Sequence, residues 1–240
     1  MNSIKIIVIT LKSAINRQES ATKQLNDQPY DWCFLDAVDG RLIEGEIEEY
    51  PRKKVRRLLG FDLSPSELGC FMSHKKAWEV ASKESVPVLI LEDDFLLNET
   101  FEKAIKFALE NLPHWDLLRL QALEDSKSKL IIKGDQFSIV KNDSDPLGST
   151  AYLVKPRTAI NLLKAARVIY EPLDHFIEHT AKHNRIIHAL TPYPVVNSGV
   201  ETTITDRPNS SRNVRGLKKF KRSFFRLLDR KLSIDPWFKK

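Results

Sequence analysis

The spacing of apolar and polar positions predicts strands that alternate with helices over residues 4–190. Apolar runs that favour strands cover residues 4–11, 32–38, 88–92, 115–120, 151–154 and 186–190. Segments with helical composition or period lie between them, at residues 16–25, 64–83, 100–111, 157–168 and 174–182. We expect residues 129–140 to form a hairpin around Gly134, the charged residues 41–62 to be a surface excursion, and the chain to become loop from Pro192. This alternation is typical of an α/β domain with a mostly parallel sheet.

The helix predicted over residues 64–83 has a well-defined start. Ser64 suits the N-cap, Pro65 suits the first helical position, and Glu67 is placed to complete a capping box. Helical spacing puts four residues along one side of this helix: Glu67, Cys70, His74 and Trp78. Leu68, Phe71 and Met72 of the same helix are expected to face the core.

Three acidic residues follow directly on an apolar strand, residues 88–91: Glu92, Asp93 and Asp94. Carboxylates at the end of a core strand are costly unless a cation meets them. In open α/β sheets, ligands bind beyond the carboxyl ends of the strands. Clustered oxygen donors suit a hard divalent cation, and a phosphorylated substrate would come with it. The alternative is a strand end with solvated charges that also suit a helix N-terminus.

The chain of 240 residues, 42% of them hydrophobic, is long enough for a substantial core. It has no apolar run of about 18 residues that could span a membrane, and its first residues do not resemble a signal peptide. The two cysteines, Cys33 and Cys70, have apolar neighbours and no metal-binding spacing, so we expect buried, reduced thiols and a cytoplasmic protein.

The net charge of +6 is divided unevenly between a domain at residues 1–206 and a tail at residues 207–240. The tail has twelve Lys and Arg against two Asp, a balance of +10, which leaves −4 for the domain. Apolar tail residues at helical spacing are Val214, Leu217, Phe220, Phe224 and Leu228. A basic amphipathic helix of this kind suits an anionic membrane surface, or else packs on the domain with a solvated charged face. The acidic domain and the lack of a base-reading motif argue against nucleic acid.

Several segments, in order along the chain, together resemble glycosyltransferase family 25, which includes bacterial lipooligosaccharide galactosyl- and glucosyltransferases. They are residues 6–11 with Arg17, Asp39-Gly40, residues 63–70 with Ser73-His74 and Trp78, residues 90–94, residues 148–152 and residues 172–174. The resemblance implies a GT-A type fold, a Rossmann-like, mostly parallel sheet with helices on both faces. It also implies a nucleotide-sugar donor and a divalent metal, Mn²⁺ or Mg²⁺.

The Glu-Asp-Asp segment is similar to the family's DxD motif, although Glu92 replaces the usual first Asp. The resemblance implies that Asp94 is the leading metal ligand, with Asp93 second. Glu92 or Asp93 would contact the ribose or reach the metal through water. The other donor-binding candidates are Thr10, Leu11, Arg17, Asp39 and His74. Three of these candidates have a simpler interpretation. Arg17 could be a surface side chain, Asp39 part of a turn, and His74 a core or capping residue.

Transfer also needs a base that takes the proton of the acceptor hydroxyl. The resemblance implies an acidic residue in the acceptor half, and Asp174 is the candidate, although it would serve equally as a helix N-cap. A further metal ligand could come from His175, His179 or His188. Tyr152 could stack on a sugar, whereas Trp115 fits the core better.

The sequence thus predicts an inverting, metal-dependent glycosyltransferase that moves a hexose, galactose favoured, from a UDP-sugar to a lipooligosaccharide core sugar. It would be a β-galactosyltransferase, peripheral at the inner face of the bacterial inner membrane and attached through the tail. The alternatives are a UDP-glucose-dependent enzyme of the same type, a nucleotide-sugar hydrolase, and a non-enzymatic peripheral membrane-binding protein.

Overall fold

The structure is a computed structural model, and it describes residues 3–123, 126–144 and 146–199. The basic tail predicted for residues 207–240 lies outside these residues. The strands are β1 (Lys5–Thr10), β2 (Asp31–Asp36), β3 (Val88–Glu92), β4 (Phe95–Leu97), β5 (Leu117–Arg119), β6 (Ser128–Lys133), β7 (Ser138–Asn142), β8 (Ala151–Val154), β9 (Ile187–Thr191) and β10 (Val195–Asn197). The helices are α1 (Ile15–Leu25), α2 (Arg52–Leu59), α3 (Pro65–Ala81), α4 (Phe101–Glu110), α5 (Pro156–Ala165), α6 (Leu173–Glu178) and α7 (Thr180–His183), with short 3-10 turns at Gly40–Leu42 and Leu112–His114.

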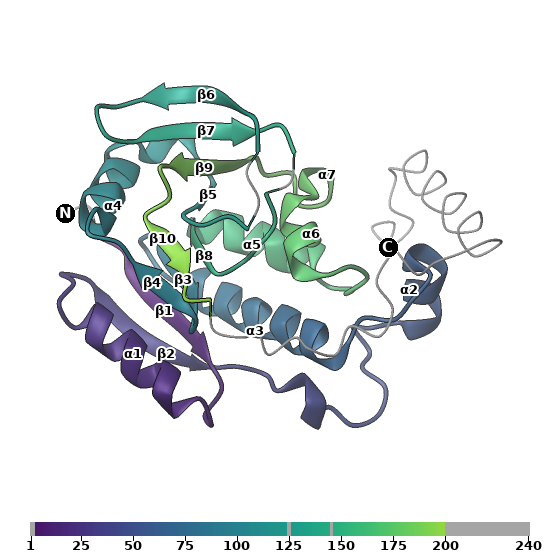
Figure 1. The fold of residues 1–240 in the computed structure, drawn as a ribbon. Coiled ribbons are helices and arrows are strands. Elements are labelled where there is room, and N and C mark those ends of the chain that lie inside the picture. Colours follow the sequence, from purple (N-terminus) through teal and green to yellow (C-terminus); the bar gives the residue numbers. More distant parts are fainter. Residues whose placement is uncertain (1–2, 124–125, 145, 200–240) are drawn as a thin grey trace.

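Eight strands form one sheet in the order β2-β1-β3-β8-β5-β9-β7-β6. The strand pairings give six strands a common direction, and β8 and β7 run against them. Figure 1 shows β2 with α1 at one end of the sheet and the β6–β7 hairpin at the other. The mostly parallel α/β sheet that the sequence predicts is therefore confirmed.

Helices cover both faces of the sheet because its central strands are apolar on both sides. Residues such as Phe71 and Trp78 of α3 and Phe176 of α6 pack with alternate residues of β1 and β3, including Ile7 and Ile90. The other set of alternate strand residues packs against α1 and α4. This alternation follows the two-residue period of a strand, so the two apolar layers are fixed by the strand sequences.

Helix α3 begins as its sequence predicts. The Ser64 side chain accepts from the Glu67 amide, and the Glu67 carboxylate accepts from the Ser64 amide. Gly69 lies so close to the preceding loop that an added Cβ would be 2.5 Å from the Val38 carbonyl oxygen and 2.6 Å from the Gly40 nitrogen. The absence of a side chain at this position lets the loop that carries Asp39 pack directly on α3.

Three local predictions were wrong. Residues 41–62 are not only a surface excursion, because Tyr50, Val55 and Leu59 are buried in the core and residues 52–59 form α2. The chain beyond Pro192 is not only loop, because β10 pairs antiparallel with β4. The cysteines are not both buried either: Cys33 is exposed on β2, the strand at one edge of the sheet.

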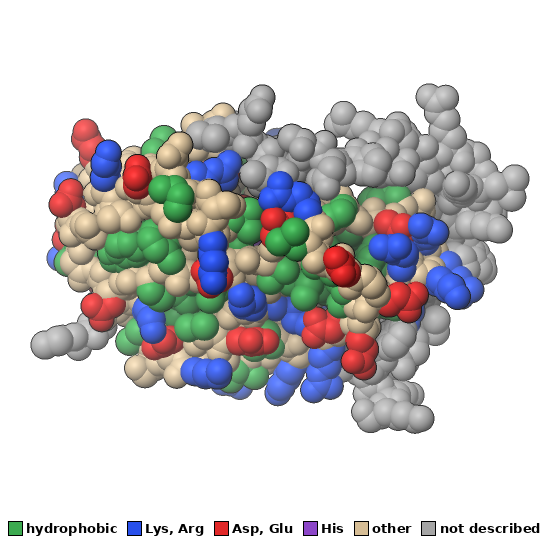
Figure 2. All heavy atoms as spheres, turned by 90° about the horizontal axis from the view of Figure 1, so that it is seen from below, with side chains coloured by type: hydrophobic (Ala, Val, Ile, Leu, Met, Phe, Trp, Pro, Cys, Tyr) green, Lys and Arg blue, Asp and Glu red, His purple; other side chains and the backbone are tan. Residues whose placement is uncertain are grey.

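The surface agrees with a domain of nearly balanced charge. Figure 2 shows acidic and basic side chains interspersed on the face it presents, with no extended patch of one sign. Within the described residues, the helices are too short or too polar to cross a membrane.

Candidate functional site

The acidic residues lie where the sheet topology favours a ligand site. The chain leaves β1 for β2 on one side and returns to β3 on the other, so the direction of winding reverses between β1 and β3. Ligands in open α/β sheets bind at this reversal, beyond the carboxyl ends of the strands. Thr10 ends β1 and Glu92 ends β3, so the structure brings these predicted site residues to one edge.

Asp93 ties the first strand and the first helix to the acidic segment. Its Oδ2 accepts a hydrogen bond from Thr10 Oγ1 at 2.7 Å, and its Oδ1 pairs with an Arg17 guanidinium nitrogen at 2.9 Å. The neighbouring Leu11 carbonyl accepts from Gln18 Nε2 at 2.9 Å. Arg17 is thus directed at the acidic segment and is not an ordinary surface arginine, since only 22% of its side chain is exposed.

Asp94 has a buried oxygen atom that no protein group satisfies. Its Oδ2 accepts from Asn197 Nδ2 at 3.0 Å, and its backbone carbonyl accepts from the Ser198 amide. Its Oδ1 is buried and has no hydrogen-bond partner. Burial, and then the negative charge of Glu92, raise the pKa of Asp94 to about 6. A buried carboxylate of this kind fits a cation, and oxygen is the ligand that Mn²⁺ and Mg²⁺ prefer.

Glu92 is held differently from Asp94. Burial favours a higher pKa for Glu92, but interactions with His74, a hydrogen bond from Ser149 and the charge of Arg17 outweigh it and lower the pKa below its usual range. The closest contacts of Glu92 Oε1 are Ser149 Oγ, which donates to it, and His74 Nε2 at 3.3 Å. Glu92 is therefore a fixed negative charge at the end of β3.

His74 is fully buried and belongs to a polar cluster beneath Glu92. Its Nδ1 lies 2.7 Å from the Tyr152 hydroxyl, and the same hydroxyl oxygen accepts a hydrogen bond from Trp78 Nε1 at 2.9 Å. The His74 and Tyr152 rings stack with centroids 5.7 Å apart. Tyr152 is completely buried, so the prediction that it stacks on a sugar was wrong, whereas Trp115 is a core residue as predicted.

Asp39 is bound within its own turn. Its carboxylate accepts from the Arg41 amide at 3.0 Å and from the Arg41 guanidinium at 2.7 and 2.8 Å. These Arg41 hydrogen bonds lower the pKa of Asp39. The turn lies against α3, where Ser73 Oγ accepts from the Val38 amide. The simpler reading of Asp39, as part of a turn, thus accounts for its contacts, and its role toward uracil or ribose stays a prediction.

Asp174 lies in the first turn of α6 and is not its N-cap, which is Pro172. Its carboxylate accepts from the His175 amide at 3.0 Å. Burial, followed by the charges of Glu92 and Asp174, raises the pKa of the Cys70 thiol well above its usual value. The negative charges of both carboxylates therefore reach the same thiol.

The other histidines considered as metal ligands are not gathered at this cluster. His179 contacts Glu171, His175 is exposed, and His188 lies on β9 among the residues of the opposite sheet face. Within the described part of the chain, Cys70, His74 and Glu92 each offer a ligand atom within 4.8 Å of the others.

Arg119 is a functional candidate that the sequence analysis missed. It is 1% exposed at the end of β5 and pairs with Glu178 of α6 at 2.5 Å. It also donates to the carbonyl oxygens of Leu147 and Gly148, in the turn that carries Ser149. The sequence signal that could have identified it is a single arginine in an apolar strand. A buried charge of this kind needs a buried partner of opposite charge.

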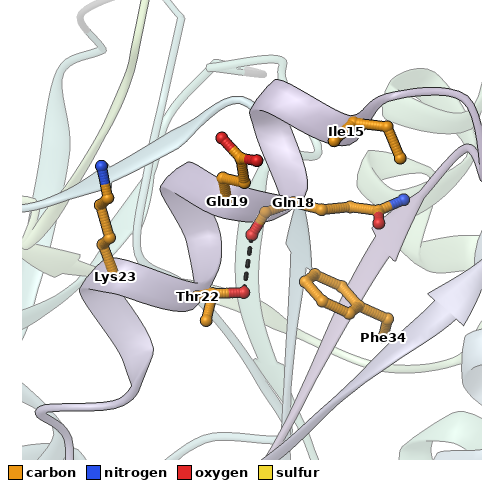
Figure 3. Close-up of a pocket in the computed structure, with 6 residues that line it drawn as sticks. All are labelled: Ile15, Gln18, Glu19, Thr22, Lys23 and Phe34. Atoms are coloured by element: carbon orange, nitrogen blue, oxygen red, sulfur yellow. Dashed lines mark hydrogen bonds between the residues drawn. The ribbon is translucent and has the colours of Figure 1, made fainter.

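A separate groove of about 380 Å³ lies between α1 and β2. Figure 3 shows Phe34 of β2 below the Gln18 side chain, and the other lining residues along α1: Ile15, Glu19, Thr22 and Lys23. None of these residues contributes to the Glu92 cluster. The groove and the acidic site are therefore different features of the surface.

An α/β sheet with acidic side chains at its topological reversal places the chain among open α/β proteins, which bind their ligands at that position. The model of glycosyltransferase family 25, described as an LPS biosynthesis protein family, matches residues 3–177. The chain therefore belongs to glycosyltransferase family 25, whose fold is of the GT-A type.

Two relatives and one solved structure illustrate the similarity. The lipooligosaccharide biosynthesis protein lic2B of Haemophilus influenzae is 30% identical over 66% of this chain and 61% of its own length. Procollagen galactosyltransferase 1-A of Xenopus laevis is 24% identical over 88% of this chain and 39% of its own. The structure of a glycosyltransferase involved in glycosylation of the major capsid of PBCV-1 aligns over 94% of this chain and 99% of its own, with 10% identity and a TM-score of 0.45. The chain thus spans less than two thirds of the two relatives' lengths.

Proposed function

We propose that this chain is an inverting, metal-dependent glycosyltransferase that moves a hexose from a UDP-sugar to a lipooligosaccharide core sugar. Family membership supports the reaction class, with a sugar-nucleotide donor and an oligosaccharide acceptor. One structural observation supports a location for the site. Asp94 Oδ1 is buried without a hydrogen-bond partner, next to two further carboxylates at the carboxyl end of β3.

Asp94 is the leading ligand for Mn²⁺ or Mg²⁺. Asp93 is a second candidate, although Thr10 and Arg17 already occupy both of its oxygens. A hard cation bound here would supply Lewis-acid neutralisation of the donor's phosphate charge. Arg17 adds a guanidinium that suits phosphate, while Thr10 and Leu11 place backbone and hydroxyl groups at the end of β1, and Asp39 would contact uracil or ribose.

The acceptor side requires a base, and we assign this role to Asp174. Helix α6 is joined to the rest of the site by the Arg119–Glu178 ion pair, so the position of Asp174 is coupled to the turn that carries Ser149. The Asp174 carboxylate would take the proton of the acceptor hydroxyl as it attacks the anomeric carbon from the face opposite the nucleotide. This geometry of attack gives inversion.

Galactose is the favoured donor sugar because five of the relatives are named procollagen galactosyltransferases. Glucose is the alternative. The lipooligosaccharide acceptor rests on the name of the Haemophilus influenzae relative.

The decisive experiment measures UDP release from a panel of UDP-sugars with Mn²⁺, with and without EDTA. We expect release from one sugar that needs metal, rises with lipooligosaccharide acceptor, and falls by at least about a hundredfold in Asp94→Ala. The matched control is Asp116→Asn, which also removes one carboxylate. Asp116 directly precedes β5 and so lies at the amino ends of the parallel strands, away from the acidic segment at their carboxyl ends. UDP release that does not change when acceptor is added would instead indicate a nucleotide-sugar hydrolase. No UDP release from any sugar would favour the non-enzymatic, membrane-binding alternative.

We further propose that residues 207–240 attach the protein to the anionic inner face of the bacterial inner membrane. The support is the +10 charge balance and the apolar spacing of the tail. Removal of the tail should abolish binding to vesicles that contain anionic lipid and leave turnover of a soluble acceptor intact. If the shortened protein still bound these vesicles, the tail would not be the anchor.

A further inference from the structure

The polar cluster beneath Glu92 contains enough hydrogen bonds to determine where its protons lie. Trp78 Nε1 can only donate, so the Tyr152 oxygen must accept at their 2.9 Å contact. The Tyr152 hydroxyl has one proton of its own, and its oxygen is 2.7 Å from His74 Nδ1. All three side chains are completely buried. Because buried polar groups are nearly always satisfied, the Tyr152 proton points at Nδ1.

This direction of donation decides the form of His74. A nitrogen that accepts a hydrogen bond carries no proton, so the neutral ring must carry its proton on Nε2. Nε2 lies 3.3 Å from Glu92 Oε1, the contact is not a well-formed hydrogen bond in this structure, and the described residues give Nε2 no other acceptor. The opposite form would leave the Tyr152 proton without an acceptor and turn a nitrogen lone pair toward a carboxylate.

We infer that Trp78 and Tyr152 are positioning residues that hold His74 in its Nε2–H form, so that His74 and Ser149 together fix the Glu92 carboxylate at the end of β3. The catalytic consequence rests on the proposed function, but the proton arrangement does not. Trp78, Tyr152 and His74 are then a supporting layer for an acidic residue of the donor site, and they do not contact the donor themselves.

A competing arrangement would place a soft cation among these groups. With its proton on Nδ1, His74 would present a lone pair beside Glu92 and the Cys70 sulfur, which together resemble a zinc donor set. The two arrangements exclude each other because a protonated Nε2 cannot bind a metal. The protonation state of His74 therefore distinguishes them.

The first test is nitrogen NMR of EDTA-treated protein with ¹⁵N-labelled histidine, in which His74→Gln assigns the His74 signals. We expect Nδ1 to show the shift of an unprotonated nitrogen and Nε2 that of a protonated one. Addition of Zn²⁺ should leave both unchanged. Protons on both nitrogens, the reverse pattern, or a Zn²⁺-dependent change at Nε2 would each overturn the inference. None of these readings requires enzymatic activity.

The second test uses two substitutions that each keep one half of the imidazole. His74→Gln retains an amide donor near the Nε2 position, whereas His74→Asn retains an acceptor near Nδ1 and loses the donor to Glu92. We expect His74→Asn to reduce kcat/KM at least tenfold more than His74→Gln, with circular dichroism confirming that both fold. Equal losses in the two variants would show that donation to Glu92 is not what His74 provides.

Tyr152→Phe tests the next link, since it removes only the hydroxyl. His74 in this variant should lose its fixed form, which NMR would show as signals shifted toward an average of the two forms. If the His74 signals matched those of the unaltered protein, Tyr152 would not be a positioning residue, whether or not the chain proves to be a glycosyltransferase.

Discussion

Replacement of Arg119 by Met should destabilise the protein strongly, although Arg119 lies in no predicted motif. The Arg119 and Glu178 side chains are 2% and 10% exposed, and their closest atoms are 2.5 Å apart. Removal of one partner of a buried ion pair typically costs about 3–5 kcal/mol, because a charge stays behind in a poorly solvated place. Met keeps most of the aliphatic volume, so a cavity adds little.

The magnitude translates into a measurable melting shift. A domain of this size loses roughly 2–4 °C per kcal/mol, so Arg119→Met should lower the Tm by roughly 6–20 °C. Differential scanning calorimetry of Arg119→Met, Glu178→Gln and the double variant completes a thermodynamic cycle. We expect the double variant to be more stable than Arg119→Met, because neutral Gln removes the stranded charge. A loss below about 1 kcal/mol in Arg119→Met would refute the reasoning.

Three further predictions concern stability. Burial raises the pKa of Asp94 from its ordinary value of 3.8 to about 6 in the folded protein. The folded state therefore binds more protons than the unfolded state between these two values, so stability should fall by about 1–3 kcal/mol as pH rises from about 4 to 6. Urea unfolding across this range should show the fall, and Asp94→Asn should remove it. Gly69→Ala should cost about 1–3 kcal/mol because its Cβ would be 2.5 Å from the Val38 oxygen; a neutral result would mean that the loop shifts freely. Val55→Ala should cost about 2 kcal/mol by urea unfolding, against less than about 0.5 for the exposed Arg57→Ala, and equal effects would contradict the packing of α2.

The sequence was sufficient to predict a helix or strand wherever the local residue types and the hydrophobic period indicate the same element. The strand at 151–154 and the capping box at Ser64 were predicted with their bounds because each depends on neighbouring residues. Helix α2 was missed because Arg and Lys dominate residues 52–57, and their solvated face obscures the buried Val55. Strands β4 and β10 are three residues each, too short for a period to emerge.

The acidic cluster was foreseeable in the same way, since Glu92, Asp93 and Asp94 are adjacent in the chain. Their different environments were not, because these come from residues far away in sequence: Ser149 for Glu92, Arg17 for Asp93, and Asn197 for Asp94. Hydrogen bonds over such separations exist only once the sheet has formed. The sequence thus indicated where the site is, and tertiary structure gave each carboxylate its own partners.

The contact between Asp94 and β10 has a consequence for how binding is transmitted. Asn197 and Ser198 are bound to the side chain and backbone of Asp94, and the described chain ends at residue 199. A cation that coordinates Asp94 Oδ1 would draw negative charge away from Oδ2, the oxygen that accepts from the Asn197 amide. Binding at the site and the anchoring of β10 are then thermodynamically linked, and by reciprocity a change that loosens β10 alters metal affinity by the same factor. The position of Asn197 on β10 would thereby respond to whether a cation occupies the site.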